Sequence, residues 1–78
     1  MLSDSTLRWR CRRGKKELDL LLARFLERHL ADLDEVQRAA FERLLALEDE
    51  DLLDLIFART RSADPAAAAV LRRLANGA

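Results

Sequence analysis

The stretch ELDLLLARFLERHL, residues 17–30, decides the fold because its apolar residues recur at intervals of three and four. In a helix, that spacing places the apolar residues on a single face, which consists of Leu18, Leu21, Leu22, Phe25 and Leu26. No part of the chain alternates apolar and polar residues with period two for long enough to form a strand. The sequence therefore predicts an all-α protein.

The same spacing continues outward on both sides and predicts a small five-helix bundle in a single domain over residues 1–78. The expected helices run about 5–13, 15–30, 34–47, 49–60 and 64–76. The predicted core consists of Leu21, Leu22, Phe25, Leu44, Leu52, Ile56 and Leu71. Val36 is expected on the apolar face of the third helix. Leu53 and Phe57 widen the apolar face of the fourth helix, which is therefore expected to be buried on two sides.

Local signals set the expected boundaries of the first four helices. Gly14 can adopt the left-handed conformation that ends a helix. Asp34 and Gln37 form an acidic variant of a capping box before the third helix. Asp49 is expected to cap the fourth helix with its side chain.

The last helix carries the clearest signals. Asp64 precedes Pro65, which is the pattern of an N-cap followed by proline at the first helical position. The helix is expected to end at Asn76–Gly77. These signals divide the chain into short, closely connected helices.

The charges are balanced overall and uneven along the chain. Fourteen basic and fourteen acidic side chains give a net charge of zero. Six basic residues lie near the start of the chain, namely Arg8, Arg10, Arg12, Arg13, Lys15 and Lys16. Residues 32–54 contain nine acids and two arginines. We therefore expect a basic end and an acidic end, and the zero balance argues against a general nucleic-acid binder.

The chain has one cysteine, Cys11, and one histidine, His29, so neither an internal disulfide nor a Cys/His metal cluster is possible. No apolar run is long enough to span a bilayer. Residues 1–15 lack the apolar segment of a secretory signal. The expectation is a cytoplasmic protein without direct membrane insertion.

The sequence provides little support for an enzyme. His29 lies late in a helix and has no identifiable catalytic partner. Cys11 follows Leu7 by one helical turn, which is typical of a small buried hydrophobe. The acidic run EDED, residues 48–51, lacks the spaced ligands and turn glycine of a calcium loop, so we interpret it as a solvated helix start.

The stretch WRCRRGKKELD, residues 9–19, is the best candidate for a functional site. If Leu7 and Cys11 face the core, Trp9 points outward, where tryptophan is favoured as an interface anchor. Periodicity alone also allows Trp9 a core position. Gly14 has no side chain and permits close approach of another backbone. A plain helical corner with a surface ion pair is the structural alternative.

These residues resemble a known family. WRCRRGKKELDLLL is similar to the opening segment of the SdhE-type FAD assembly factors of succinate dehydrogenase, whose signature is R-G-x-x-E. Arg13, Gly14 and Glu17 occupy the three signature positions. FERLLALEDEDLLDLI resembles the family's second block, F-x-R-L-L followed by an acidic D-x-D-L. In this chain Glu50 replaces a frequent proline and Leu55 a frequent aromatic residue, and both suit a helix.

The resemblance implies a helper that is not itself an enzyme. Such a protein binds the flavoprotein subunit of succinate dehydrogenase or fumarate reductase and promotes covalent attachment of FAD. The client would form the bond, and the FAD would belong to the client, so the helper has no cofactor of its own. The partner-binding residues expected from the resemblance are Trp9, Arg12, Arg13, Gly14, Glu17 and Asp19.

Two other readings of the sequence remain open at this point. The chain could be a small helical adaptor or antitoxin-like regulator that binds another protein without a flavin role. It could also be a helical nucleic-acid module using its basic segment, although the acidic middle of the chain argues against that. Co-purification with a flavoprotein, another protein or DNA would separate these readings.

Overall fold

The computed structural model describes residues 2–76, whose regular elements are all helices, with no strand among them. The elements are α1 (Asp4–Arg10), α2 (Lys16–His29), a 3₁₀ turn η1 (Leu30–Asp32), α3 (Glu35–Leu45), α4 (Asp49–Ile56) and α5 (Pro65–Asn76). The prediction of an all-α fold with five α-helices is therefore confirmed.

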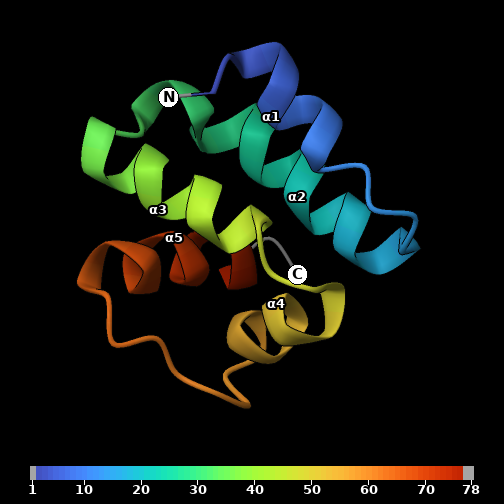
Figure 1. The fold of residues 1–78 in the computed structure, drawn as a ribbon, viewed down its shortest axis with the longest axis vertical. Coiled ribbons are helices and arrows are strands. Elements are labelled where there is room, and N and C mark those ends of the chain that lie inside the picture. Colours follow the sequence, from blue (N-terminus) through green and yellow to red (C-terminus); the bar gives the residue numbers. More distant parts are fainter. Residues whose placement is uncertain (1, 77–78) are drawn as a thin grey trace.

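The last helix, α5, holds the bundle together. It packs against α2, α3 and α4, and Figure 1 shows α5 crossing close to α3 while α1 lies at the other end of the molecule. All seven predicted core residues are buried. The rings of Phe25 and Phe41 meet at the centre with centroids 4.8 Å apart.

Two predictions about apolar faces are wrong. Val36 is 65% exposed, because it lies in the first turn of α3 and the buried part of that helix begins one turn later, at Ala40 and Phe41. Phe57 is 39% exposed, so α4 is not buried on two sides. Phe57 follows the last helical residue, where the chain turns away from the core, and the guanidinium of Arg59 lies over its ring.

Two capping predictions are confirmed. Asp34 and Gln37 form the reciprocal capping box at the start of α3. Asp64 accepts a hydrogen bond from the Ala66 N–H, 3.0 Å away, at the start of α5. The α5 helix is described as far as Asn76, and Gly77 lies outside the described residues.

The expected cap of α4 is wrong. Glu48 occupies the N-cap position without a side-chain hydrogen bond, and Asp49 is the first residue of the helix. Its carboxylate bonds Arg13 instead of the backbone of its own helix. The fourth helix is also shorter than predicted, because Ala58 adopts a positive φ of 58°.

Two backbone hydrogen bonds close the turn that ends α4. The Arg59 N–H donates to the Asp54 carbonyl at 2.8 Å, and the Ala58 N–H donates to the Leu55 carbonyl at 3.2 Å. This is the hydrogen-bond pattern of the Schellman motif, which satisfies the last carbonyls of a helix. Alanine occupies the left-handed position that glycine usually takes, so no residue type here signals the end of the helix.

Candidate docking site

The first helix ends at Arg10, three residues earlier than expected, and residues 11–15 connect it to α2. Gly14 lies in this connection with φ of 82°. Residues other than glycine rarely adopt such a backbone conformation. A Cβ at Gly14 would meet no heavy atom within 4 Å. The glycine is therefore required by the backbone conformation, and the space beside it is open.

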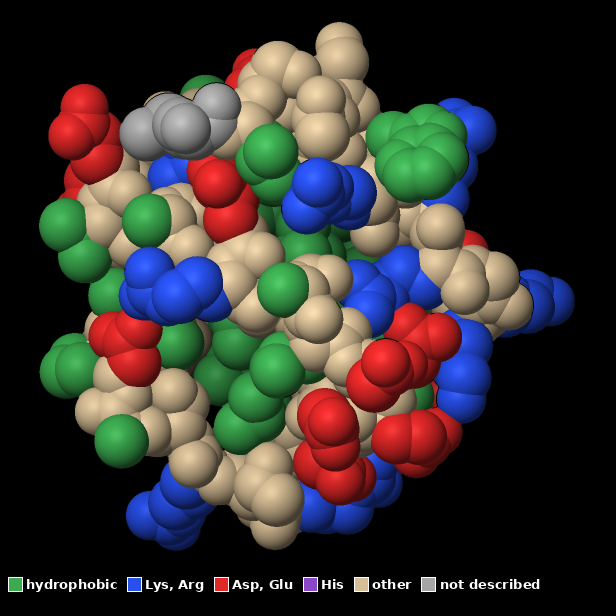
Figure 2. Space-filling model, viewed as in Figure 1, with side chains coloured by type: hydrophobic (Ala, Val, Ile, Leu, Met, Phe, Trp, Pro, Cys, Tyr) green, Lys and Arg blue, Asp and Glu red, His purple; other side chains and the backbone are tan. Residues whose placement is uncertain are grey.

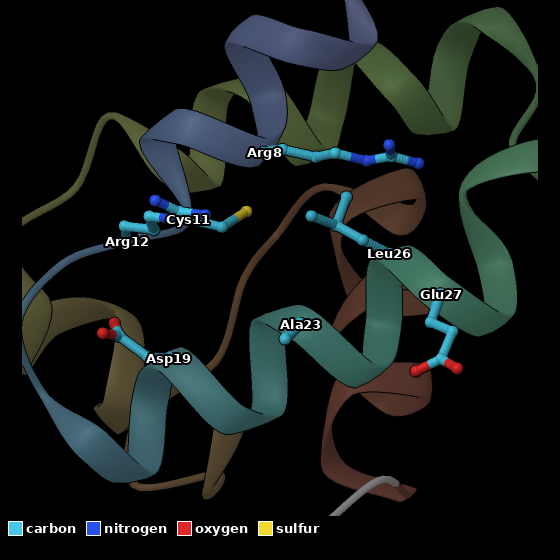
Figure 3. A pocket seen from close by; sticks show the side chains of 7 residues that line it. All are labelled: Arg8, Cys11, Arg12, Asp19, Ala23, Leu26 and Glu27. Carbon is cyan, nitrogen blue, oxygen red and sulfur yellow. The ribbon is translucent and has the colours of Figure 1, made fainter.

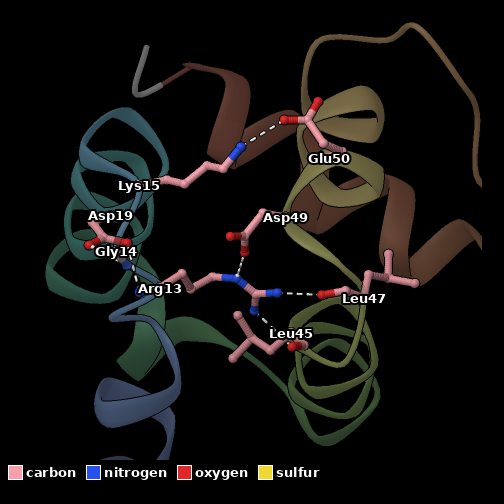
Figure 4. A network of polar contacts seen from close by, with 8 residues as sticks. All are labelled: Arg13, Gly14, Lys15, Asp19, Leu45, Leu47, Asp49 and Glu50. Carbon is pink, nitrogen blue, oxygen red and sulfur yellow. Dashed lines mark hydrogen bonds and ion pairs between the residues drawn. The ribbon is translucent and has the colours of Figure 1, made fainter.

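Arg13 turns inward and spans the gap to the link between α3 and α4 (Figure 4). Its guanidinium donates to the Leu45 carbonyl at 2.8 Å, to the Leu47 carbonyl and to the Asp49 carboxylate. The side chain is only 13% exposed. The Arg13 side chain, which the resemblance assigns to partner binding, therefore has a structural role, because it ties the α1–α2 connection to the second half of the bundle.

Asp19 fixes the same connection from the opposite side. Its carboxylate accepts the backbone N–H groups of Arg13, at 2.8 Å, and Gly14, at 3.2 Å. Both N–H groups lie just before α2, and Asp19 belongs to the first turn of that helix. The aspartate therefore holds the α1–α2 connection against the start of α2. Arg13 and Asp19, two of the predicted partner-binding residues, thus have internal hydrogen-bond partners.

The basic and acidic segments lie next to each other and do not form opposite ends, which corrects the sequence prediction. Lys15 pairs with Glu50 at 2.7 Å, beside the bond between Arg13 and Asp49. The hydrogen bond and charge of Glu50 raise the pKa of Lys15. Figure 2 shows acidic side chains gathered over the start of α4, with basic side chains beside them. The EDED run is therefore partly engaged by the basic segment.

The other four predicted partner-binding residues, Trp9, Arg12, Gly14 and Glu17, are exposed. Leu7 and Cys11 are buried at 0% and 4% exposure, so helical geometry turns Trp9 outward, where it is 74% exposed. Neither Arg12 nor Glu17 makes a hydrogen bond or ion pair within residues 2–76. We call these four residues the open corner, because their side chains or backbone remain available for a partner.

A hollow of about 470 Å³ lies between α1 and α2 (Figure 3). Its lining residues are Arg8, Cys11, Arg12, Asp19, Ala23, Leu26 and Glu27. The Cys11 thiol points across the hollow toward Leu26. Burial raises the pKa of this thiol to about 11, so it stays protonated near neutral pH and is a poor nucleophile. The prediction that Cys11 is a small buried hydrophobe agrees with this position.

The one histidine of the chain has an aromatic neighbour on its own helix. His29 ends α2 and packs against the Phe25 ring at 5.5 Å. Within the described part of the chain, no group of three His, Cys, Asp or Glu side chains could hold a metal ion. No helix there is long and apolar enough to cross a bilayer. What the fold provides is a braced connection with an exposed glycine, glutamate and tryptophan.

Sequence reasoning missed the residues that hold Arg13. Two of them, Leu45 and Leu47, act through backbone carbonyls, which leave no trace in residue type. The third, Asp49, belongs to the acidic block that carries the family resemblance, and its pairing with a signature residue 36 positions earlier is visible only in the fold.

A family model described as "Flavinator of succinate dehydrogenase" matches residues 5–78. Among curated proteins, the "FAD assembly factor SdhE" of Methylococcus capsulatus is 44% identical over 74 residues, covering 95% of this chain and 89% of the relative. The proteins of the same name from Photobacterium profundum and Idiomarina loihiensis are each 38% identical, covering 87% and 85% of this chain and 77% and 73% of the relatives. No solved structure matches the chain significantly.

Proposed function

This chain belongs to the family of flavinators of succinate dehydrogenase, and from that membership we propose that it assists loading of FAD onto the flavoprotein subunit of that enzyme or of fumarate reductase. In this proposal the chain binds the flavoprotein and promotes covalent attachment of the flavin. The client supplies the reacting groups and holds the FAD, and the helper acts as a non-enzymatic assembly factor with no cofactor of its own.

The open corner is the observation that carries this proposal. Gly14 presents bare backbone to solvent, and the carboxylate of Glu17 makes no hydrogen bond or ion pair within the described residues. Exposed tryptophan is a frequent anchor in protein interfaces, and Trp9 lies in α1 next to this connection. Along the chain, this exposed glycine lies between an exposed tryptophan and a carboxylate without a partner in the described residues, an arrangement that fits close docking onto a client.

A charge deletion at Glu17 tests the proposed role of the corner. Glu17→Ala should leave the melting temperature nearly unchanged, because exposed substitutions typically shift stability by less than about 0.5 kcal/mol. Covalent flavin on the client should nevertheless fall sharply, as measured by flavin fluorescence of the client band in a denaturing gel. Glu35→Ala is the matched control, since Glu35 is also exposed in the first turn of a helix.

Gly14 allows backbone strain and surface access to be tested separately. In a chemically synthesised chain, Gly14→D-Ala accommodates the positive φ and adds only a methyl group at an exposed position. It should preserve folding and block complex formation with the client. Gly14→L-Ala places its methyl group on the other side of Cα, in open space, and adds backbone strain that costs about 1–2 kcal/mol.

The outcomes at Glu17 and Gly14 decide the proposal for this surface. If folded Glu17→Ala and Gly14→D-Ala both support full flavin attachment, the open corner is not the docking site. Wild-type protein that instead co-purifies with an unrelated partner, and leaves client flavin unchanged, would favour the adaptor reading.

A further inference from the structure

We propose that Asp49 is a positioning residue for docking, which acts through Arg13 to hold the Gly14–Glu17 segment in the orientation that the client recognises. This inference rests on the proposed function. It assigns a role to a carboxylate in the second half of the chain that lies outside the open corner itself.

Three acceptors converge on one guanidinium. The three acceptors of Arg13 are the Leu45 carbonyl, the Leu47 carbonyl and the Asp49 carboxylate, which lie at the end of α3, in the link and at the start of α4. A planar guanidinium with donors in a fixed fork is held in one orientation by several acceptors. Asp49 is the only one of the three acceptors that carries a charge, so it alone forms an ion pair with the guanidinium.

Arg13 is linked directly to the open corner. Arg13 directly precedes Gly14, and the backbone N–H groups of both residues are held by Asp19. Side-chain bonds to the α3–α4 link and backbone bonds to α2 therefore fix this residue from two directions. Loss of the Asp49 charge would release the anchor to the start of α4, and the Gly14–Glu17 segment would then be held mainly by its bonds to α2.

Asp49 differs from its acidic neighbours in exposure and in the bonds that it makes. The Asp49 side chain is 26% exposed and bonded to Arg13, which is 13% exposed. The neighbouring pair between Lys15 and Glu50 has side chains that are 45% and 71% exposed, and exposed pairs of this kind hold a loop weakly. Asp51 is exposed and makes no hydrogen bond or ion pair within residues 2–76. Asp51 is therefore the matched control for Asp49.

The experiment measures the Kd for the purified client flavoprotein at low temperature, where circular dichroism shows each variant fully folded. Asp49→Asn should weaken binding about tenfold or more, as expected for loss of a charge-assisted hydrogen bond. Asp51→Asn should bind like the wild type. Hydrogen exchange of the Gly14 amide should be faster in Asp49→Asn, while exchange of the Leu22 amide in the core should be unchanged.

A double variant distinguishes positioning from direct contact. In an Arg13→Ala background, Asp49→Asn should cause no further loss of client binding, because the carboxylate acts through the arginine. The inference is overturned if Asp49→Asn binds the client like the wild type. It is also overturned if the same loss appears with and without Arg13. Wild-type protein that fails to bind the flavoprotein would refute the proposed function, and this inference with it.

Discussion

Replacing Arg13 by alanine should strongly destabilise the fold, although the residue lies in a connection between helices. The substitution removes three hydrogen bonds and leaves the Leu45 and Leu47 carbonyls and the Asp49 carboxylate without this partner. Each hydrogen bond to a charged group contributes about 1.5–3 kcal/mol. Asp49 is partly exposed, so water recovers part of that loss. We expect the free energy of unfolding to fall by about 2–4 kcal/mol.

That loss is large for a domain of this size, whose total stability is about 4–12 kcal/mol at typical values per residue. The melting temperature should fall by roughly 10–30 °C, since each kcal/mol corresponds to about 4–8 °C in a small domain. Urea unfolding followed by circular dichroism measures the change directly. Arg13→Lys should recover only part of the loss, because lysine lacks the planar fork.

The neighbouring arginine provides the control for this prediction. Arg12 is exposed and makes no hydrogen bond or ion pair within residues 2–76. Arg12→Ala should therefore change the free energy of unfolding by less than about 0.5 kcal/mol. Equal effects of the two substitutions, or an Arg13→Ala protein as stable as the wild type, would refute the assignment of Arg13 as an internal brace.

Three further changes test other parts of the fold. Ala58→Gly should raise the free energy of unfolding by about 1 kcal/mol in urea denaturation, because glycine tolerates the positive φ at this position. Phe25→Ala should lower it by about 3–5 kcal/mol, since this ring packs on Phe41 in the core. Cys11→Ala should lower stability somewhat and keep client flavin attachment. The raised thiol pKa predicts that wild-type stability falls as the pH rises from about 9 toward about 11, since the unfolded chain loses the proton first. Comparing urea unfolding at pH 8 and pH 10 in both proteins isolates this effect, and an equal pH dependence in the alanine variant would contradict it.

The features that the sequence predicted correctly depend on neighbours close in the chain. Leucine and phenylalanine at intervals of three and four identify helical faces, and the caps at Asp34 and Asp64 act within three residues of their own positions. For Trp9 the spacing left an outward and a core position open, and the burial of Leu7 and Cys11 in the structure selects the outward one. Local spacing thus accounts for the helical faces and the caps, whereas the position of Trp9 in the open corner is decided by the fold.

The features that the sequence did not predict depend on distant residues or on uncommon choices. Arg13 finds its acceptors 32–36 residues later, and two of these are backbone carbonyls. The end of α4 uses Ala58 where glycine would have signalled the turn. The face of α3 is set by where Phe41 fits against Phe25, which a count of apolar intervals within one helix does not reveal.

The central claim is that this chain promotes flavin loading through its open corner, and a reconstituted time course tests it most directly. Purified flavoprotein subunit lacking covalent flavin is incubated with FAD, with and without a stoichiometric amount of this protein, and covalent flavin is followed by fluorescence in denaturing gels. The account predicts faster attachment with the wild-type protein and a rate near the unassisted one with Glu17→Ala. Equal rates with and without the wild-type protein would contradict the account.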